Sequence, residues 1–234
     1  MLTNLQYIHL FDSCKILPAR AGEVSHLVNT KIIPNKKRYE QISDLVSGRV
    51  NQRSACFMKS IDDLSVYSLA TQRLYQNSIN VNIINKSTAI PWYFIACVHY
   101  RESSSNFNKH LHNGDPLSNY TKQFPANRPQ VGHKPPFTFE ESAADALKLR
   151  KLDKESLWSL PKILARLEQY NGIAKAYETN HINSPYLWGG SNLYTKGGFP
   201  RDHFFSLSYV NKQLGVAVIL KELEQRGVVF MPRH

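Results

Sequence analysis

One apolar segment constrains the fold of this 234-residue chain more than any other. Residues 90–98 read IPWYFIACV, and the four residues that follow, His99 to Glu102, are polar. A helix that is apolar on every side is normally buried, and proline in the first turn is typical of a helix start. We therefore expect a buried helix from Trp92 to about Glu102. The nine-residue run is about half as long as a bilayer span requires, which excludes a transmembrane helix.

Further helices are expected on both sides of this segment. Apolar spacing predicts one from Tyr39 to Val50, and Ser60 is a suitable N-cap for the next. Thr138 is followed three residues later by Glu141, which is the spacing of a capping box. Periodicity and helix-stop residues predict two more, at residues 159–171 and 211–226. Residues 103–137, with at most one short hairpin, and residues 180–205 are expected to be loops.

These elements predict a mainly α fold, or at most α+β, with a central buried helix and a small loop or hairpin region. Residues 1–35 show no sustained period and contain two prolines and a glycine, so we expect a loosely organised N-terminal extension. Residues 36–234 are expected to form one domain, with N-terminal helices at 36–87 and the core at 88–234.

The charge of the chain bears on its partners. There are 29 Lys and Arg against 18 Asp and Glu, a net charge of +11, which favours polyanions such as nucleic acid, acidic membranes or cell-wall polymers. The basic residues are scattered and no nucleic-acid-binding motif is present, so nucleic acid is not expected. Three widely spaced cysteines exclude a disulfide framework and a cysteine-rich zinc site. The first residues do not read as a signal peptide, so we expect synthesis in the cytoplasm and a separate export route.

Glu102 is the first candidate for catalysis. Desolvation at the end of a buried helix raises the pKa of a carboxyl group, and a negative charge is unfavourable at a helix C-terminus. A carboxylic acid that stays protonated near neutral pH is what a general acid requires. The alternative is a structural one, in which Glu102 pairs with Arg101 or another base at the surface.

The residues around Glu102 resemble a known family. HYRESSSNF at 99–107 is similar to the catalytic segment of the lysozyme superfamily, especially goose-type lysozymes and soluble lytic transglycosylases, in which an acidic residue at the end of a buried helix is followed by Ser and an aromatic residue. Gln169-Tyr170-Asn171-Gly172 resembles the segment of these families that lines the sugar cleft. HNGDPL at 112–117 and SPYLW at 184–188 are similar to lysins of phages and bacteria. The resemblance spans about residues 88–220 and implies a lysozyme-like domain over 36–234, with Glu102 as its general acid.

A second catalytic group is less clearly marked. Phage-type lysozymes use a Glu, then an Asp on a small hairpin, then a Thr to position water, and Glu102, Asp115 and Thr121 follow that order. The alternative is that Asp115 only initiates the turn before Pro116, a common role for Asp. Goose-type enzymes and transglycosylases often lack an equivalent Asp, so both interpretations are compatible with a glycosidase.

Several other residues are candidates for binding sugar. Aromatic rings stack on sugar faces, and amides and hydroxyls bind hydroxyl and N-acetyl groups. Beside Tyr170 and Asn171, we expect Asn192, Tyr194 and Tyr186 to bind substrate, although Tyr186, like its neighbours Leu187 and Trp188, could also be a core anchor. The residues His110, His112 and His133 read as solvated loop histidines rather than metal ligands, and Cys97 as a small core residue. No metal and no cofactor are expected.

The resulting hypothesis is a peptidoglycan-cleaving glycosidase that acts as a monomer on glycan strands in the cell wall or periplasm. Glu102 protonates the oxygen between N-acetylmuramic acid and N-acetylglucosamine. If Asp115 and Thr121 face it, they orient water and the bond is hydrolysed with inversion; otherwise the muramyl 6-hydroxyl attacks, as in a lytic transglycosylase. The surplus positive charge serves adhesion to an anionic wall. A phage endolysin and a delivered bacterial toxin fit equally, and a non-catalytic glycan-binding protein is the alternative of another class.

Overall fold

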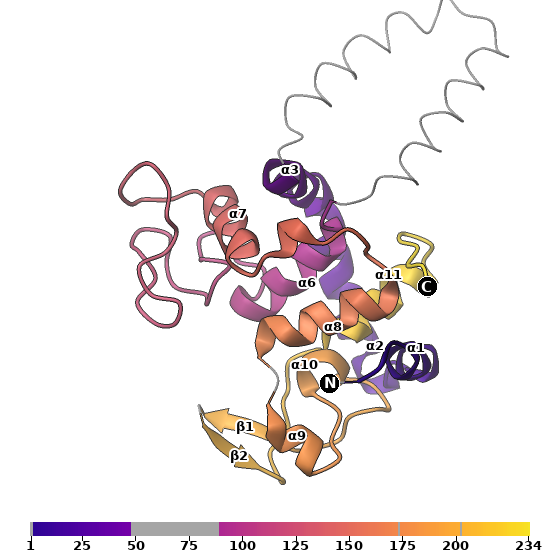
Figure 1. The fold of residues 1–234 in the computed structure, drawn as a ribbon. Helices are drawn as coiled ribbons and strands as arrows, with labels where there is room; N and C mark the ends of the chain where they lie inside the picture. Colours follow the sequence, from indigo (N-terminus) through magenta and orange to yellow (C-terminus); the bar gives the residue numbers. More distant parts are fainter. Residues whose placement is uncertain (1, 48–88, 173, 202) are drawn as a thin grey trace, which may run out of the picture.

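The computed structural model describes residues 2–47, 89–172, 174–201 and 203–234 (Figure 1). The chain forms a mainly helical body with one small two-stranded sheet. The α-helices are α1 Asn4–Ser13, α2 Pro18–Leu27, α3 Lys36–Ser47, α6 Trp92–Ser103, α7 Phe139–Leu149, α8 Leu160–Asn171, α9 Lys175–Thr179, α10 Pro185–Trp188 and α11 Val216–Gln225. The strands are β1 Gly198–Arg201 and β2 Phe204–Ser206, and short non-α turns are Val28–Ile32, Ile33–Asn35 and Leu152–Lys154. The predicted helix that begins at Ser60 lies outside the described residues.

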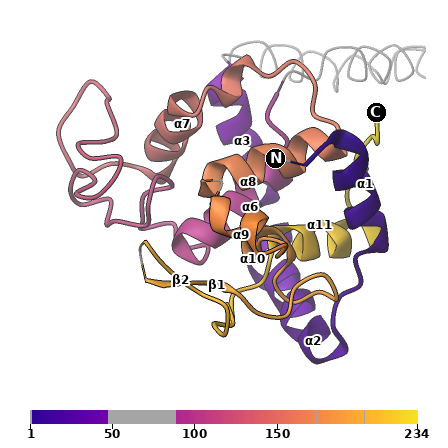
Figure 2. The same cartoon turned by 60° about the horizontal axis from the view of Figure 1, so that its bottom comes forward.

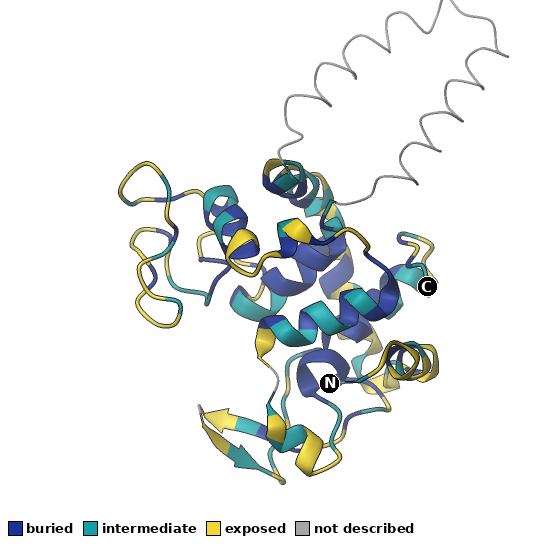
Figure 3. Cartoon of the chain, viewed as in Figure 1, coloured by how far each residue is buried: buried dark blue, intermediate teal, exposed yellow. Residues whose placement is uncertain are grey.

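Helix α6 runs through the middle of the body and packs against α3, α8 and α11 (Figures 1 and 2). Its residues 94–99 are buried on every face of the helix, and Figure 3 shows it as the buried centre of the fold. The predicted buried helix is therefore confirmed, and Cys97 is a core residue as expected. Because α6 is held on all sides, the polar residues at its C-terminal end have fixed positions.

The N-terminal segment is not loosely organised, and that expectation is wrong for residues 2–35. Thr3 and Gln6 form a capping box at the start of α1, and Tyr7 and Phe11 are buried in the core. The Tyr7 hydroxyl donates a hydrogen bond to Glu168, which ties α1 to α8. Periodicity failed here because short helices and turns interrupted by proline at 18 and 34 do not share one continuous apolar stripe.

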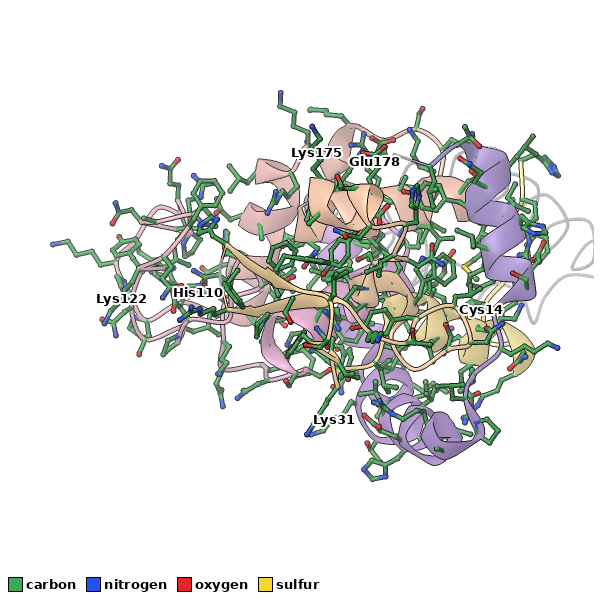
Figure 4. All side chains as sticks on the ribbon, turned by 90° about the horizontal axis from the view of Figure 1, so that it is seen from below. Cys14, Lys31, His110, Lys122, Lys175 and Glu178 are labelled. Carbon is green, nitrogen blue, oxygen red and sulfur yellow. The ribbon has the colours of Figure 1, made fainter. Side chains whose placement is uncertain are left out.

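The segment 104–137 is non-helical, as predicted, but it is anchored to α7 by buried polar groups. His110 bonds the Ser142 hydroxyl with Nδ1 at 2.9 Å and the Asn119 carbonyl with Nε2 at 2.7 Å. His112 bonds Asp145 at 2.8 Å. The expectation that these two histidines are solvated is wrong, since both are buried, whereas His133 is exposed. Figure 4 shows His110 in this segment, at the end of the molecule opposite α1, with Lys122 at its outer edge.

Helix boundaries near the end of the chain differ partly from the predictions. The starts at Thr138 and Ser159 and the stop at Gly172 are confirmed. Helix α11 begins only at Val216, after Gly215 as its N-cap. The antiparallel pair β1–β2 lies in a region expected to be loop, while residues 104–137 contain only an isolated bridge between Lys109 and Pro116 within the described chain. No helix among the described residues is long and apolar enough to cross a membrane.

Candidate active site

The site is built at the C-terminal end of α6, which is closed by a residue from far along the chain. Ser104 takes the left-handed conformation (φ 55°), and its amide donates to carbonyls of the last turn, as is common at a helix C-cap. The Gln213 side-chain amide donates to the carbonyls of Tyr100 and Arg101 at 3.2 and 3.3 Å. The bond to Arg101 satisfies a carbonyl that a helix end otherwise leaves without a partner, and the Tyr100 carbonyl accepts from both Ser104 and Gln213.

The backbone of Glu102 is also held by a close approach of the following loop. Gly114 has φ +78°, and a Cβ atom at this position would lie 2.5 Å from the Glu102 carbonyl oxygen. Only glycine fits such an approach without a shift of the backbone. The glycine of the sequence HNGDPL therefore places the loop that carries Asp115 directly against the last turn of α6.

The side chain of Glu102 lies in a largely desolvated setting with two kinds of partner. The Tyr186 hydroxyl donates to Glu102 Oε1 at 3.4 Å, which is a long hydrogen bond. The guanidinium of Arg101 lies 4.6 Å from the Tyr186 ring centroid and donates to the Leu214 carbonyl at 3.1 Å. Glu102 itself keeps intermediate exposure, so it is packed but still reachable by solvent.

Burial raises the pKa of Glu102 to about 7, against the charges of Arg101 and Arg150 and the Tyr186 hydrogen bond, which all lower it. Desolvation wins because the carboxylate would lose more hydration than these partners replace. The sequence prediction of a raised pKa is thus confirmed in direction. Near neutral pH a large share of Glu102 keeps its proton, which is the state that a general acid needs.

Tyr170 and Arg150 form the wall of the site that comes from α7 and α8. Tyr170 is buried, and its hydroxyl donates to the Leu111 carbonyl at 3.0 Å. The exposed Arg150, which caps α7, lies with its guanidinium carbon 5.0 Å from the Tyr170 ring centroid. The pKa of Tyr170 is raised mainly by burial and also by the charge of Glu102. The structure thus brings Tyr170 and Tyr186 close to Glu102, but both are buried, and Tyr186 is a core residue, as in the alternative that the sequence left open.

His99 supports the site from inside the core, one turn before Glu102. Its Nδ1 lies 3.0 Å from the Tyr39 hydroxyl, and its ring packs against Phe107 and Phe139 at 4.5 and 4.2 Å between centroids. Burial lowers the pKa of His99 to about 4, so the ring is neutral at physiological pH. Phe107 is therefore one of the aromatic side chains that fix the end of α6.

Asp115 and Thr121 lie in the adjoining loop, and no hydrogen bond or ion pair in the described part of the chain joins either one to Glu102. Asp115 accepts hydrogen bonds from the Asn113 amide and the Lys122 backbone, each at 2.9 Å. Although partial burial opposes it, these bonds lower the pKa of Asp115, so the group is ionised at neutral pH. The Thr121 hydroxyl donates to the Pro125 carbonyl and accepts from the Arg128 amide. Thr121 thus holds the loop with both hydrogen-bonding functions of its hydroxyl.

The remaining predicted substrate residues are engaged elsewhere. Asn192 accepts from the Lys15 amide at 2.7 Å and donates to the Ser13 carbonyl at 3.2 Å, and so fastens the N-terminal segment. The buried Tyr194 donates to the Gly197 carbonyl and accepts from the Asn211 amide. Asn171 is exposed at the end of α8. Within the described residues, no hydrogen bond joins any of these side chains to Glu102.

Among the described residues, two cavities illustrate that open volume also lies away from Glu102, which lines neither of them. One of about 580 Å³ lies between the loop and the starts of α3 and α7, and includes Arg38, Phe107 and Glu140. The other, of about 230 Å³, is lined by α1, α8 and α9 residues that include Glu168. The described residues hold no group of three or more His, Cys, Asp or Glu placed to bind a metal ion. We place the candidate site at Glu102 because this acid has Tyr170 and Tyr186 near it and because the charge of the exposed Arg150 acts on it.

Sequence reasoning missed Arg150, Gln213 and the supporting role of His99. Arg150 follows a clear helix, yet nothing local marks it as a residue whose charge acts on Glu102, because its position depends on the contact with the Tyr170 ring of α8. His99 could have been found, since a histidine that continues an apolar run inside a helix has no solvent face.

Comparisons with family models, with characterised proteins and with solved structures yield no match for this chain.

Proposed function

We propose that this chain is a peptidoglycan-cleaving glycosidase on a lysozyme-like helical domain, with Glu102 as the general acid. The observation that carries the proposal is the setting of Glu102: a carboxyl group at the end of the buried helix α6, with a pKa of about 7, that accepts a hydrogen bond from Tyr186 and raises the pKa of the neighbouring Tyr170. Such an acid can protonate the glycosidic oxygen between N-acetylmuramic acid and N-acetylglucosamine as the bond breaks.

The charge distribution supports a polymeric and anionic substrate. A net charge of +11 attracts acidic cell-wall polymers, and this attraction weakens with salt. Tyr170 and Tyr186 are buried, with Arg150 and Arg101 against their rings, so they support the acid from within the fold and leave sugar contacts to the exposed groups around it. The ionised Asp115 could serve as the base that activates water, on the opposite side of the sugar.

A second candidate function is that of a lytic transglycosylase, in which the muramyl 6-hydroxyl replaces water. It is favoured by Thr121, whose one hydroxyl donor is used by the Pro125 carbonyl, so that it has no proton left to donate to the oxygen of an attacking water. Both functions use the same acid. They differ in the product, because transglycosylation leaves an anhydro-muramyl end that is lighter by one water.

The test is mass spectrometry of soluble fragments released from purified peptidoglycan by the wild type, by Glu102→Gln and by Glu178→Gln. Glu178 is a carboxylate on α9 and serves as the matched control. We expect Glu102→Gln to lower fragment release by about 100-fold or more, and Glu178→Gln to leave it unchanged. Release by the wild type should fall as the pH rises through about 7, because Glu102 then loses its proton.

Each outcome assigns the chain to one class. Reducing muramyl ends identify a hydrolase, and anhydro ends identify a transglycosylase. If none of the three proteins releases fragments from the walls of several bacteria, the enzymatic proposal is contradicted. The non-catalytic glycan-binding protein is then the favoured function. Steeply salt-dependent binding of DNA or RNA would instead point to a nucleic-acid partner.

A further inference from the structure

Arg150 presents an exposed guanidinium beside the candidate acid. It is the C-cap residue of α7, and its guanidinium carbon lies 5.0 Å from the centroid of the Tyr170 ring. Its charge acts on Glu102 as well as on Tyr170. A guanidinium that lies on an aromatic ring loses much of its rotational freedom. Arg150 is therefore a cation held in place at the edge of the site, not a freely moving surface side chain.

The hydrogen-bond donors of this guanidinium are free within the described part of the chain. Other arginines of the loop and core have partners: Arg128 binds Asp145 through two bonds of 2.8 and 2.7 Å, and Arg38 binds Glu140. Arg150 has its aromatic contact, and none of its side-chain N–H groups is bonded to another described residue. A guanidinium carries five N–H donors in a planar fork that matches a carboxylate.

We propose that Arg150 binds a carboxylate on the peptide stem of the muramic acid next to the bond that is cleaved, an inference that rests on the proposed function. Peptidoglycan differs from neutral chitin in carrying such carboxylates along the glycan. A two-bond pair with Arg150 would fix the orientation of the strand over Glu102. It would also offset the positive charge that opposes protonation of Glu102, so that bound substrate favours the acid form.

The experiment compares soluble stem-bearing glycan oligomers with the same oligomers after their carboxyl groups have been converted to amides. Binding is measured by titration calorimetry and cleavage by fragment analysis, for the wild type, Arg150→Gln and Lys148→Gln. Lys148 is an exposed cation on the same last turn of α7 and controls for unspecific attraction. We expect the wild type to bind the carboxylate form about tenfold or more tightly, Arg150→Gln to lose this preference, and Lys148→Gln to keep it.

The readouts separate this inference from the function on which it rests. If Arg150→Gln keeps the full preference, or if Lys148→Gln loses as much of it, the assignment of Arg150 is overturned. Cleavage by the wild type without any preference for the carboxylate form would leave the glycosidase standing and remove the role of Arg150. Binding with the expected preference but without cleavage would contradict the glycosidase and retain Arg150 as a carboxylate-binding residue.

Discussion

Glu102 and Asp115 are two carboxyl groups that lie close in sequence and differ in nearly every physical respect. Glu102 ends a buried helix and has one long hydrogen bond, so burial raises its pKa to about 7. Asp115 lies in a turn where backbone and side-chain amides donate to it, and its pKa is lowered. The comparison teaches that burial with few hydrogen-bond donors raises the pKa of one carboxyl group, whereas several donors at a more solvated position lower the pKa of the other.

The largest effect on this comparison is expected from Asp115→Asn. If the ionised group activates water, its loss should lower hydrolysis by about 100-fold while the pH dependence set by Glu102 stays in place. The measurement is the rate of fragment release across pH. Asn113→Ala is the matched control, since it removes one donor to Asp115 but keeps the carboxylate. An equal loss in both variants would mean that Asp115 acts only by shaping the loop.

A second prediction concerns the free energy of unfolding. The contributions of Glu102 and Asp115 to it should change in opposite directions as the pH rises. Because the folded pKa of Glu102 is raised, its contribution is present at low pH and is lost as the pH rises from its ordinary value of 4.5 through about 7. One pKa unit corresponds to about 1.4 kcal/mol, so the loss is limited to about 3 kcal/mol. The difference in stability between Glu102→Gln and the wild type should therefore shift in favour of the variant between pH 4.5 and pH 8.

Asp115 should behave in the reverse manner. Its folded pKa is lowered, so its contribution is present at neutral pH and is lost as the pH falls. Asp115→Asn should thus lower the melting temperature at pH 7 and have less effect at acidic pH. Thermal unfolding of the two variants at several pH values checks both signs. Parallel curves for the two variants would contradict the contrast between the groups.

The smallest effect is expected from Tyr186→Phe. This change removes the 3.4 Å hydrogen bond to Glu102, which lowers the pKa of that group, so the pKa should rise and activity should persist to higher pH. Because the bond is long, the change in rate should be less than about tenfold. The pH–rate profile is the measurement, with Tyr194→Phe as control because its hydroxyl bonds backbone groups elsewhere. A shift to lower pH would show that Tyr186 does not stabilise the carboxylate.

Much of the fold was predictable where one local signal decides the structure. The apolar run of α6, the capping box at Thr138 and the Asn171–Gly172 stop each act within a few residues, and all three are found. The N-terminal helices were missed because their apolar faces are short and point to different neighbours. The buried histidines of the loop were missed because their partners, Ser142 and Asp145, lie about thirty residues away.

The candidate site was predictable only in part, for a related reason. Glu102 could be chosen because its own helix determines its burial. The residues that surround it come from several other segments; Tyr170 could be proposed only through a resemblance, and Tyr186 also from its aromatic chemistry. Asn192 and Tyr194 have the right chemistry for binding sugar, but the sequence does not reveal that backbone groups already occupy them.

The closure of α6 by Gln213 also determines when the site can exist during synthesis. The amide of Gln213 reaches the Tyr100 carbonyl across 113 residues of chain, and Arg101 likewise depends on the Leu214 carbonyl. A nascent chain is made from its N-terminus at about 5–20 residues per second, so Glu102 leaves the ribosome well before these partners are made. Glu102 is therefore synthesised early, before the residues that hold its helix end. Activity is expected only after Gln213, Leu214 and helix α11 have packed against α6.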